Sequence, residues 1–364
     1  MDKPDLLVVG GGVFGLSVAL EGLRAGLTTV IADQTQPGMG ASATPVGALT
    51  PHMPEGWGPL KAFQFESLCA LPDAAARLAS EAGAAPFYSQ TGRLTPLTTP
   101  AARARAERQI AAAEEIWQGR ARVEVLDRAP KEAEAVIAPG ACLHGLMHDT
   151  LSARLHPRRY LAALRQRVAA GAEVLTGWTA QSLGEDGREV ICDRGRLAAS
   201  HIVLAAGWQT GALAPVGFEG GVKGQAAMLS ADLPVDLPVL QAPGLFIVRH
   251  GPGEVAVGST SERVWTHLDV DAQLDNVIEK AHAFCPPLAG AQVIARWAGV
   301  RPKGPRPEPV IGPLPGRPGI WIASGGYKIG LGIAHHAARA LIGAITENAK
   351  EPALPEIFLP RAAG

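Results

Sequence analysis

The first 33 residues alternate between apolar runs and a helical pattern. Residues 6–9 form a short apolar run, typical of a strand that is buried on both faces. Residues 13–25 carry apolar side chains at helical spacing, and Gly26 suits the left-handed position that ends a helix. A second apolar run, residues 28–32, ends at Asp33. The pattern predicts a strand, a helix and a parallel strand, joined by a right-handed crossover.

The spacing of apolar residues predicts further helices and strands along the chain. Residues 70–82 and 100–118 are typical of helices, and residues 156–183 of a helix followed by a strand. Residues 201–208 predict a buried strand that ends in a glycine turn. The stretch GLFIVRHGPGEVAVGST predicts a hairpin whose turn is HGPG. Residues 319–345 predict a strand, a glycine turn and an apolar helix.

This order of elements predicts an α/β fold with two interleaved parts. We expect a Rossmann-like dinucleotide-binding domain, interrupted twice by a smaller, antiparallel β-rich substrate domain. The expected nucleotide domain comprises residues 1–85, 146–220 and 291–364. The expected substrate domain comprises residues 86–145 and 221–290. A length of 364 residues is sufficient for two such domains.

Composition and charge narrow the range of functions. The formal net charge of −1 gives no electrostatic reason to expect nucleic acid or an anionic membrane as a partner. No run of about 18 apolar residues suggests a membrane-spanning helix. The four cysteines are isolated, so we expect reduced thiols, no zinc site and a cytoplasmic protein. No ligand spacing suggests a metal, and a homo-oligomer remains open.

Glycines between the first strand and the first helix indicate a dinucleotide site. Gly10, Gly12 and Gly15 satisfy the pattern G-x-G-x-x-G. The first permits a tight turn, the second lets a pyrophosphate approach the backbone, and the third lets helix and strand pack closely. Asp33 follows about 20 residues later, where a carboxylate can accept hydrogen bonds from a ribose diol and disfavours NADP. This unit alone does not separate NAD from FAD.

Later segments resemble the D-amino acid oxidase family of FAD-dependent oxidoreductases, most closely its glycine oxidase branch. The resemblance rests on PGMGASATPVGALTPHMPEG, RLHPRRYLAAL, VLAAGWQTGAL, RWAGVRPKGPRPEPVIGPLP and IASGGYKIGLGIAHHAARALIG. It implies a D-amino acid oxidase type of FAD-binding domain and non-covalent FAD. The backbone amides of GGYKIGLG suit the pyrimidine edge of the flavin. The residues expected to contact FAD are Gly10, Gly12, Val13, Phe14, Gly15, Asp33, Gln34, Ala41, Ser42, Gly47, Ala48, Leu49, Val174, Ala205, Ala206, Gly207, Trp208, Arg301, Gly325, Gly326, Tyr327, Lys328, Gly330, Leu331 and Gly332.

The resemblance also implies substrate-binding residues. Arg301, in GVRP, matches the arginine with which relatives bind the substrate carboxylate. Lys328 stands where close relatives carry a second arginine, and lysine lacks the planar fork. Phe246 stands where glycine oxidases tend to place a tyrosine, and Tyr327 could supply a hydroxyl instead. These departures put simple glycine specificity in doubt. His52 and Arg249 are further candidates for contact with the substrate.

The expected activity is oxidation of a small amine or amino acid, of the glycine, D-amino acid or N-substituted glycine type. Hydride transfer to flavin N5 would give an imine, and O2 would accept the electrons to give H2O2. One alternative is a flavin dehydrogenase of a 2-hydroxy acid or amino acid with another electron acceptor. A second is an FAD-binding protein without catalytic activity, and an NAD-dependent dehydrogenase is more remote.

Overall fold

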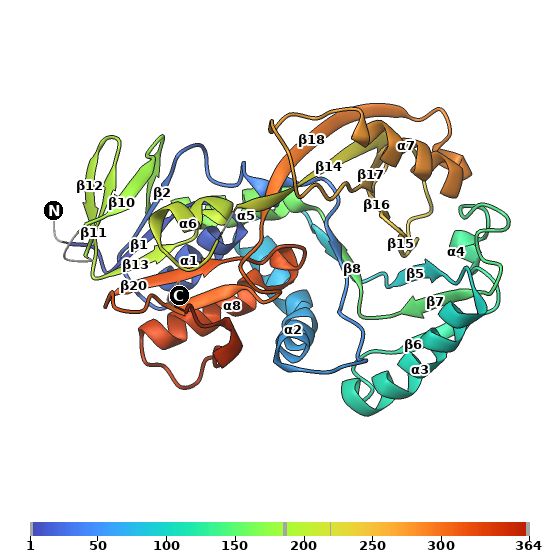
Figure 1. Ribbon diagram of the computed structural model, residues 1–364, viewed down its shortest axis with the longest axis horizontal. Helices are drawn as coiled ribbons and strands as arrows, with labels where there is room; N and C mark the ends of the chain where they lie inside the picture. The colour runs from blue at the N-terminus through green and yellow to red at the C-terminus, as the bar shows by residue number, and fades with distance from the viewer. Residues whose placement is uncertain (1–2, 185–187, 219, 362–364) are drawn as a thin grey trace.

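The computed structural model describes residues 3–184, 188–218 and 220–361, which fold around two main sheets (Figure 1). The first sheet has six strands and contains the predicted β1–α1–β2 unit. Its order is β19 (Val310–Pro313), β20 (Ile320–Ser324), β13 (His201–Leu204), β1 (Leu6–Val9), β2 (Thr29–Asp33) and β9 (Glu173–Thr176). Neighbouring strands are parallel except for β19, which is antiparallel to β20.

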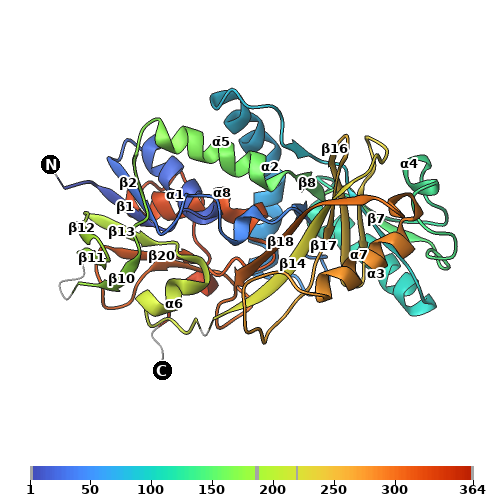
Figure 2. The same ribbon diagram turned by 90° about the horizontal axis from the view of Figure 1, so that it is seen from above.

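Both faces of this sheet are covered, as its apolar strands predict. On one face lie α1 (Val13–Arg24), α2 (Pro59–Glu81), α5 (Pro157–Ala169) and α8 (Gly330–Ile345), which Figure 2 shows together. Leu6 and Val8 belong to the core on the helical side. Leu7 and Val9 belong to the core that includes β10 (Ala180–Leu183), β11 (Glu189–Cys192) and β12 (Gly195–Ala198). This alternation follows from the two-residue period of a strand.

The second sheet has eight strands and is antiparallel at every pairing except β15 with β5. Its order is β18 (Gln292–Pro302), β14 (Gly221–Ser230), β17 (Glu254–Gly258), β16 (Leu245–Gly251), β15 (Val239–Ala242), β5 (Arg93–Pro96), β7 (Leu146–Asp149) and β6 (Val123–Leu126). The helix α7 (Gln273–Phe284) packs on one face of this sheet, and α3 (Pro100–Trp117) packs beside β6.

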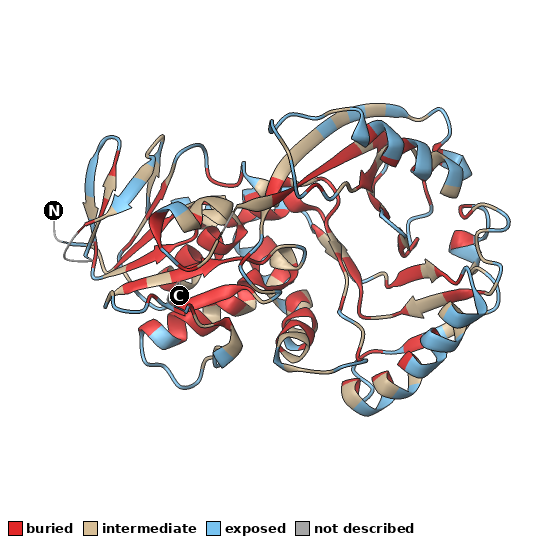
Figure 3. Cartoon of the chain, viewed as in Figure 1, coloured by how far each residue is buried: buried red, intermediate tan, exposed pale blue. Residues whose placement is uncertain are grey.

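The two faces of the eight-stranded sheet have different partners. Leu240, Ile247 and Val257 share a core with the buried face of α7. Val239 and Val248 point the other way and share a small core with Val46. Figure 3 shows buried residues along the strands and exposed residues on the outer faces of α3 and α7. The face away from α7 is therefore the one that turns toward the six-stranded sheet.

Short elements complete the described chain. The strands β10, β11 and β12 form one small sheet, and a second has the order β3 (Ala48–Leu49), β8 (Ala153–Leu155) and β4 (Tyr88–Ser89). The helices α4 (Lys131–Glu134) and α6 (Thr210–Leu213) are single turns. The 3-10 turns are Ala41–Ala43, Gly207–Gln209, Pro286–Leu288 and Glu356–Phe358. In the described residues, no helix is long and apolar enough to cross a membrane.

The predicted fold class is confirmed, and two details differ from the sequence prediction. The helix predicted at residues 70–82 begins at Pro59, because Phe63 and Phe65 in its first turns are buried in the core that α8 shares. Strands β7 and β18 begin at the predicted boundaries near residues 146 and 291, yet they pair within the eight-stranded sheet. The division of the chain into nucleotide and substrate domains remains a prediction.

Candidate active site

A cavity of about 1130 Å³ lies between the two main sheets. It is lined by the residues that follow β1, β2 and β13, by the first residues of α1 and α8, and by the face of the eight-stranded sheet that is turned away from α7. Its volume exceeds the roughly 300–1,000 Å³ of sites for drug-sized ligands. The cavity is therefore large enough for an extended cofactor together with a small substrate.

The start of α1 forms one wall of this cavity. Gly12, Val13 and Phe14 line it, and Gly12, which precedes the helix, has no side chain of its own to cap it. Gly10 has φ 101°, and a Cβ there would lie 2.5 Å from the carbonyl oxygen of Ala205. The first N–H groups of a helix lack partners within the helix and carry a partial positive charge. This wall therefore suits a pyrophosphate, as the glycine pattern predicts.

The carboxylate of Asp33 holds the glycine turn against the end of β2. Its Oδ2 accepts a hydrogen bond from Gly11 N at 2.6 Å, and its Oδ1 accepts one from Thr35 N at 2.7 Å. Asp33 and Gln34 line the cavity, and Gln34 Nε2 donates to Gln209 Oε1 at 3.0 Å. Because each carboxylate oxygen can accept more than one hydrogen bond, contact with a ribose remains available to Asp33.

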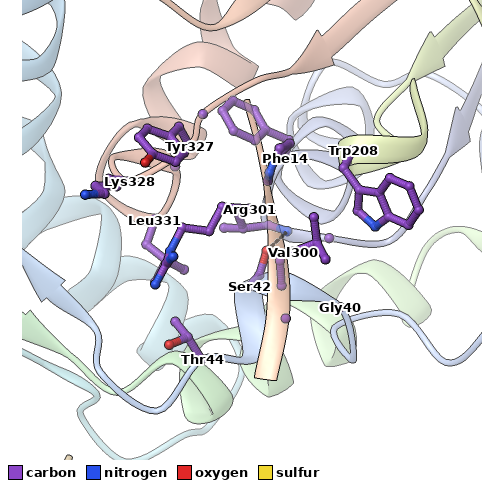
Figure 4. Close-up of a pocket in the computed structure, with 18 of the residues that line it drawn as sticks. Phe14, Gly40, Ser42, Thr44, Trp208, Val300, Arg301, Tyr327, Lys328 and Leu331 are labelled. Carbon is purple, nitrogen blue, oxygen red and sulfur yellow. Dashed lines mark hydrogen bonds between the residues drawn. The ribbon is translucent and has the colours of Figure 1, made fainter. Parts of the chain in front are cut away.

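The segment after β2 crosses the cavity beside the start of α1. Ser42 Oγ accepts a hydrogen bond from Val13 N at 3.0 Å, and this bond satisfies one free amide of the helix. Ala41, Gly47 and Ala48 line the cavity together with Ser42, whereas Leu49 is buried. Figure 4 shows Gly40, Ser42 and Thr44 following one another along this part of the cavity wall.

The turn before α8 forms another wall. Gly326, Tyr327, Lys328, Gly330 and Leu331 line the cavity. The backbone of Tyr327 has φ 40°, an uncommon value for a residue with a side chain. Its N–H donates to Pro302 O at 3.0 Å, which ties this turn to the end of β18. The start of α8 has no side-chain cap, so its amides are available for hydrogen bonds to a ligand.

Arg301 reaches from β18 to the space below this turn (Figure 4). Its NH2 donates to Ser259 Oγ at 2.7 Å and its NH1 to Thr260 O at 3.1 Å. Burial lowers the pKa of the guanidinium, while the neighbouring Tyr327 and Glu262 oppose this effect. A Cβ at Gly224, on β14, would collide with both terminal nitrogens. The absence of a side chain at Gly224 therefore makes room for Arg301.

A buried ionic network lies behind Arg301. Thr260 Oγ1 is 2.5 Å from Glu262 Oε1, and Glu262 Oε2 is 3.4 Å from Lys223 Nζ. Lys223 is only 1% exposed, and its Nζ lies 2.9 Å from Asp271 Oδ2. Against the effect of desolvation, these two carboxylates raise the pKa of Lys223. Gln225 Nε2 completes the network through hydrogen bonds to Glu262 and Asp271.

Tyr327 and Lys328 form a second group of polar side chains in the cavity. The Lys328 Nζ lies 5.4 Å from the centre of the Tyr327 ring. Burial of the phenol opposes ionisation, but a hydrogen bond with Ser261 and the nearby Lys328 cation lower the pKa of Tyr327 overall. The side chain at position 328 thus adds positive charge near Arg301 without a second planar fork.

The other two substrate candidates have different surroundings. His52 lines the cavity, and its backbone N–H donates to Gln64 Oε1 at 2.8 Å. Desolvation lowers the pKa of the His52 imidazole, and the Lys61 cation acts in the same direction. Arg249 does not line the cavity: it is buried, and its Nε donates to Leu233 O at 2.8 Å. A contact between Arg249 and substrate remains a prediction that the cavity does not support.

Several predicted cofactor residues shape the walls without lining the cavity. A Cβ at Gly15 would collide with Gly10 O, and one at Gly332 would lie 3.1 Å from Leu68. Val174 pairs with Ile31 in the sheet. The predicted residues outside the cavity lining are Gly15, Leu49, Val174, Gly325 and Gly332, whereas the remaining predicted cofactor residues, including Ala205, Ala206, Gly207 and Trp208, line it. Their contacts with FAD remain predictions.

Several residues that line the cavity are not among those that the sequence predicts. Trp178 and Thr179 line the cavity near β9, in place of Val174. Arg93, Gln241 and Trp297 line it from the eight-stranded sheet. Alternation along each strand could have indicated that these side chains point to one face, but it does not show which strands are neighbours. Among the described residues, no cluster of His, Cys, Asp or Glu is arranged to hold a metal ion.

Comparisons with known proteins agree with the geometry of this cavity. Residues 5–343 match the family described as FAD dependent oxidoreductase. Glycine oxidase of Pseudomonas putida is 30% identical over 344 residues, which cover 91% of each chain. Glycine oxidase of Pseudomonas aeruginosa is 27% identical over 358 residues, which cover 92% of this chain and 93% of that one. The crystal structure of glycine oxidase from Geobacillus kaustophilus has the same fold, with a TM-score of 0.87 over the whole of both chains at 23% identity. This chain therefore belongs to the D-amino acid oxidase (DAO) family of FAD-dependent oxidoreductases, and its cofactor is FAD.

Proposed function

We propose that this enzyme oxidises a small amino acid or N-substituted glycine to the corresponding imine, with O2 as the electron acceptor. The observation that carries the proposal is the guanidinium of Arg301, fixed inside the cavity by Ser259 and Thr260. When bound, FAD would supply a two-electron acceptor for the hydride of the substrate α-carbon, and O2 together with two protons would take up both electrons as H2O2. The similarity to glycine oxidases supports an amino acid as the substrate.

The residues present fit FAD bound without a covalent bond. The start of α1, with Gly10, Gly12 and Val13, would hold the pyrophosphate. Asp33 would accept a hydrogen bond from the ribose. The start of α8 would meet the pyrimidine edge of the flavin and stabilise negative charge there.

Arg301 would orient the substrate through its carboxylate. Each terminal nitrogen of a guanidinium carries two hydrogens, and the bonds to Ser259 and Thr260 account for one on each nitrogen. The remaining hydrogens can donate to the oxygens of a carboxylate. Lys328 would add charge, and the Tyr327 hydroxyl would supply another hydrogen bond. These contacts would hold the substrate α-carbon in place and lower the entropic cost of reaction.

The sheet below the cavity favours a substrate larger than glycine. Phe246 and Trp297 both line it and present aromatic surface. Phe246 has no polar atom that could replace the hydroxyl of the tyrosine that glycine oxidases tend to carry near this position. We propose that this surface accommodates a substituent on the nitrogen or the α-carbon. Four free cysteines are consistent with work in the cytoplasm.

The test is anaerobic reduction of the flavin in the purified protein, followed at its visible absorbance bands. We expect bleaching with at least one member of a panel of glycine, sarcosine, longer N-alkylglycines, D-amino acids and L-proline. Air should then restore the colour and release one H2O2 per flavin. Bleaching without reoxidation by air would identify a dehydrogenase instead. A flavin that remains oxidised with every member of the panel would contradict the proposal.

A further inference from the structure

The part of the cavity formed by β5 and β15 contains a second buried arginine. Arg93 is 5% exposed, and its Nε donates to Asp149 Oδ2 at 2.7 Å. Asp149 is fully buried and also accepts hydrogen bonds from Ser152 N at 2.8 Å and Ser152 Oγ at 3.0 Å. The carboxylate therefore lies behind Arg93 and fixes the guanidinium by one edge.

The opposite edge of this guanidinium faces the cavity. Its NH1 donates to Gln241 Oε1 at 2.7 Å, and its NH2 lies 3.2 Å from Met53 Sδ. All three side chains line the cavity. A thioether is a weak acceptor, and each terminal nitrogen has a second hydrogen. Among the described residues, Met53 is the only recorded acceptor for NH2, so this edge retains capacity to bind an oxygen.

Gln241 adds further donors at the same place. Arginine has no acceptor atom, so the carboxamide oxygen of Gln241 must face Arg93 and its NH2 group must point elsewhere. Gln241 pairs directly with Phe246 across β15 and β16. Directly opposed residues in an antiparallel pair share one face of a sheet. The side chains of Gln241 and Phe246 therefore lie next to each other on the face that lines the cavity.

Arg93 and Arg301 mark two separate polar regions of one cavity. In the strand order β18-β14-β17-β16-β15-β5, five steps lead from Arg301 to Arg93. At about 4.8 Å a step, the two strands lie about 24 Å apart across the sheet, and both arginine side chains extend from their strands into the cavity. Phe246 and Trp297 line the cavity from the strands between or beside them. An elongated molecule would thus meet an arginine, aromatic surface and a second arginine.

We propose that Arg93 and Gln241 form a second substrate subsite, which binds a carboxylate or carboxamide at the far end of the substrate while Arg301 binds its α-carboxylate. This inference rests on the proposed function. The negative charge of Asp149 balances the positive charge of Arg93. The subsite therefore selects the distal group of the substrate by its hydrogen-bond donors and not by a net positive charge. The substrate class is an amino acid or N-substituted glycine that carries a distal acceptor group.

The first experiment compares matched substrates. N-carboxyalkylglycines with one to six methylenes are assayed beside the corresponding amides and beside N-alkylglycines of equal length. We expect one chain length at which the acid and the amide exceed the alkyl compound about tenfold or more in kcat/KM. Equal values for all three groups at every length would overturn the subsite. Turnover of alkylglycines in that case would leave the proposed function intact.

The second experiment uses variants that keep the ion pair of Arg93 with Asp149. Gln241→Leu should remove most of the advantage of both acid and amide. Gln241→Glu should weaken the acid about tenfold by charge repulsion and retain the amide. Gln90→Leu is the matched control, because Gln90 is exposed and its side chain bonds to Thr150 O, outside the cavity lining. An unchanged ratio of acid to alkyl substrate in both Gln241 variants would overturn the proposal.

Binding without turnover provides an independent readout. In calorimetric titration of the FAD-bound protein, we expect dicarboxylates from glutarate to suberate to bind more tightly than butyrate, and Gln241→Glu to abolish this difference. If Gln241→Glu still binds dicarboxylates more tightly than butyrate, the second carboxylate binds elsewhere. This result would contradict the subsite. Because this measurement needs no flavin reduction, it separates failure of the subsite from failure of the proposed function.

Discussion

Arg301 NH1 donates to the backbone carbonyl of Thr260 at 3.1 Å, and this bond links the substrate arginine to a buried ionic network. The side chain of the same threonine is hydrogen-bonded to Glu262, which faces the buried Lys223. Because the guanidinium of Arg301 bonds to the backbone of Thr260, its position depends on the contacts that hold Thr260 in place. The network therefore positions Arg301 without contacting the substrate.

This relationship predicts the effect of Glu262→Gln. The amide cannot balance the Lys223 cation, which retains only Asp271 as a charged partner. We expect a loss of about 1–3 kcal/mol in the free energy of unfolding, because removing one partner from a buried ion pair is costly. KM for carboxylate substrates should rise more than kcat falls. Chemical denaturation and steady-state kinetics measure both, and an unchanged KM would show that the network is only structural.

Gly224→Ala tests the space reserved for the guanidinium. The new Cβ would overlap NH1 and NH2 of Arg301, so the side chain must leave its present position. We expect kcat/KM for amino acids to fall at least tenfold, equivalent to about 1.4 kcal/mol, while the flavin remains bound. Gly58→Ala is the control, since a Cβ there meets no atom within 4 Å. Equal kinetics in the two variants would contradict this use of Gly224.

Tyr327 should ionise before the other tyrosines. The chain has three tyrosines, and burial raises the pKa of Tyr160 to about 12 and also raises that of Tyr88. Ser261 and Lys328 lower the pKa of Tyr327. Alkaline titration at 295 nm should thus show one early phase, which Tyr327→Phe abolishes. Because the folded-state pKa lies below the unfolded one, this tyrosine makes the fold more stable as pH rises between the two values.

His335 predicts a loss of stability in acid. Its ring is buried within α8, and desolvation lowers its pKa to about 3. The unfolded chain takes up this proton near pH 6.5, whereas the folded chain remains neutral until a much lower pH. The contribution of His335 to stability is therefore complete above pH 6.5 and declines below it, by about 2 kcal/mol at pH 5.

Replacement of this histidine checks the assignment. His335→Leu removes the titrating group and keeps an apolar side chain in the helix. We expect the difference in free energy of unfolding between pH 7 and pH 5 to shrink by about 2 kcal/mol relative to the original protein. Urea denaturation at the two pH values supplies the measurement. The same decline with pH in both proteins would assign the acid sensitivity to other groups.

The sequence predicts the nucleotide end of the molecule well because its signals are local. Gly10, Gly12 and Gly15 lie within six consecutive positions, and the steric reasons for each operate over a single turn. The turn before α8 is predicted for the same reason. Its glycines and its helix are adjacent in the chain, and the resemblance to the family extends over both.

The substrate side is less predictable because it depends on distant pairings. Arg93 and Gln241 meet only because β5 lies parallel to β15, and no local pattern shows that neighbour relationship. Arg249 illustrates the converse. The sequence predicts the hairpin that contains Arg249. Contact with the substrate, however, depends on which face of the sheet turns toward the cavity, and Arg249 does not line it. The cavity residues on β18, β16 and β15 come together because of the order of the strands in the sheet, and the sequence does not predict that order.

The central claim is that Arg301 binds the carboxylate of an amine substrate beside the flavin. It is tested most directly by the rate of anaerobic flavin reduction in Arg301→Ala and Arg301→Lys, measured with an amino acid and with the matching amine that lacks the carboxylate. We predict that both variants retain FAD. The rate of flavin reduction by the amino acid at low concentration should fall about 100-fold or more with Ala and less with Lys, and the rate with the amine should change much less. Full activity of Arg301→Ala toward the amino acid, with its flavin bound, would contradict the account.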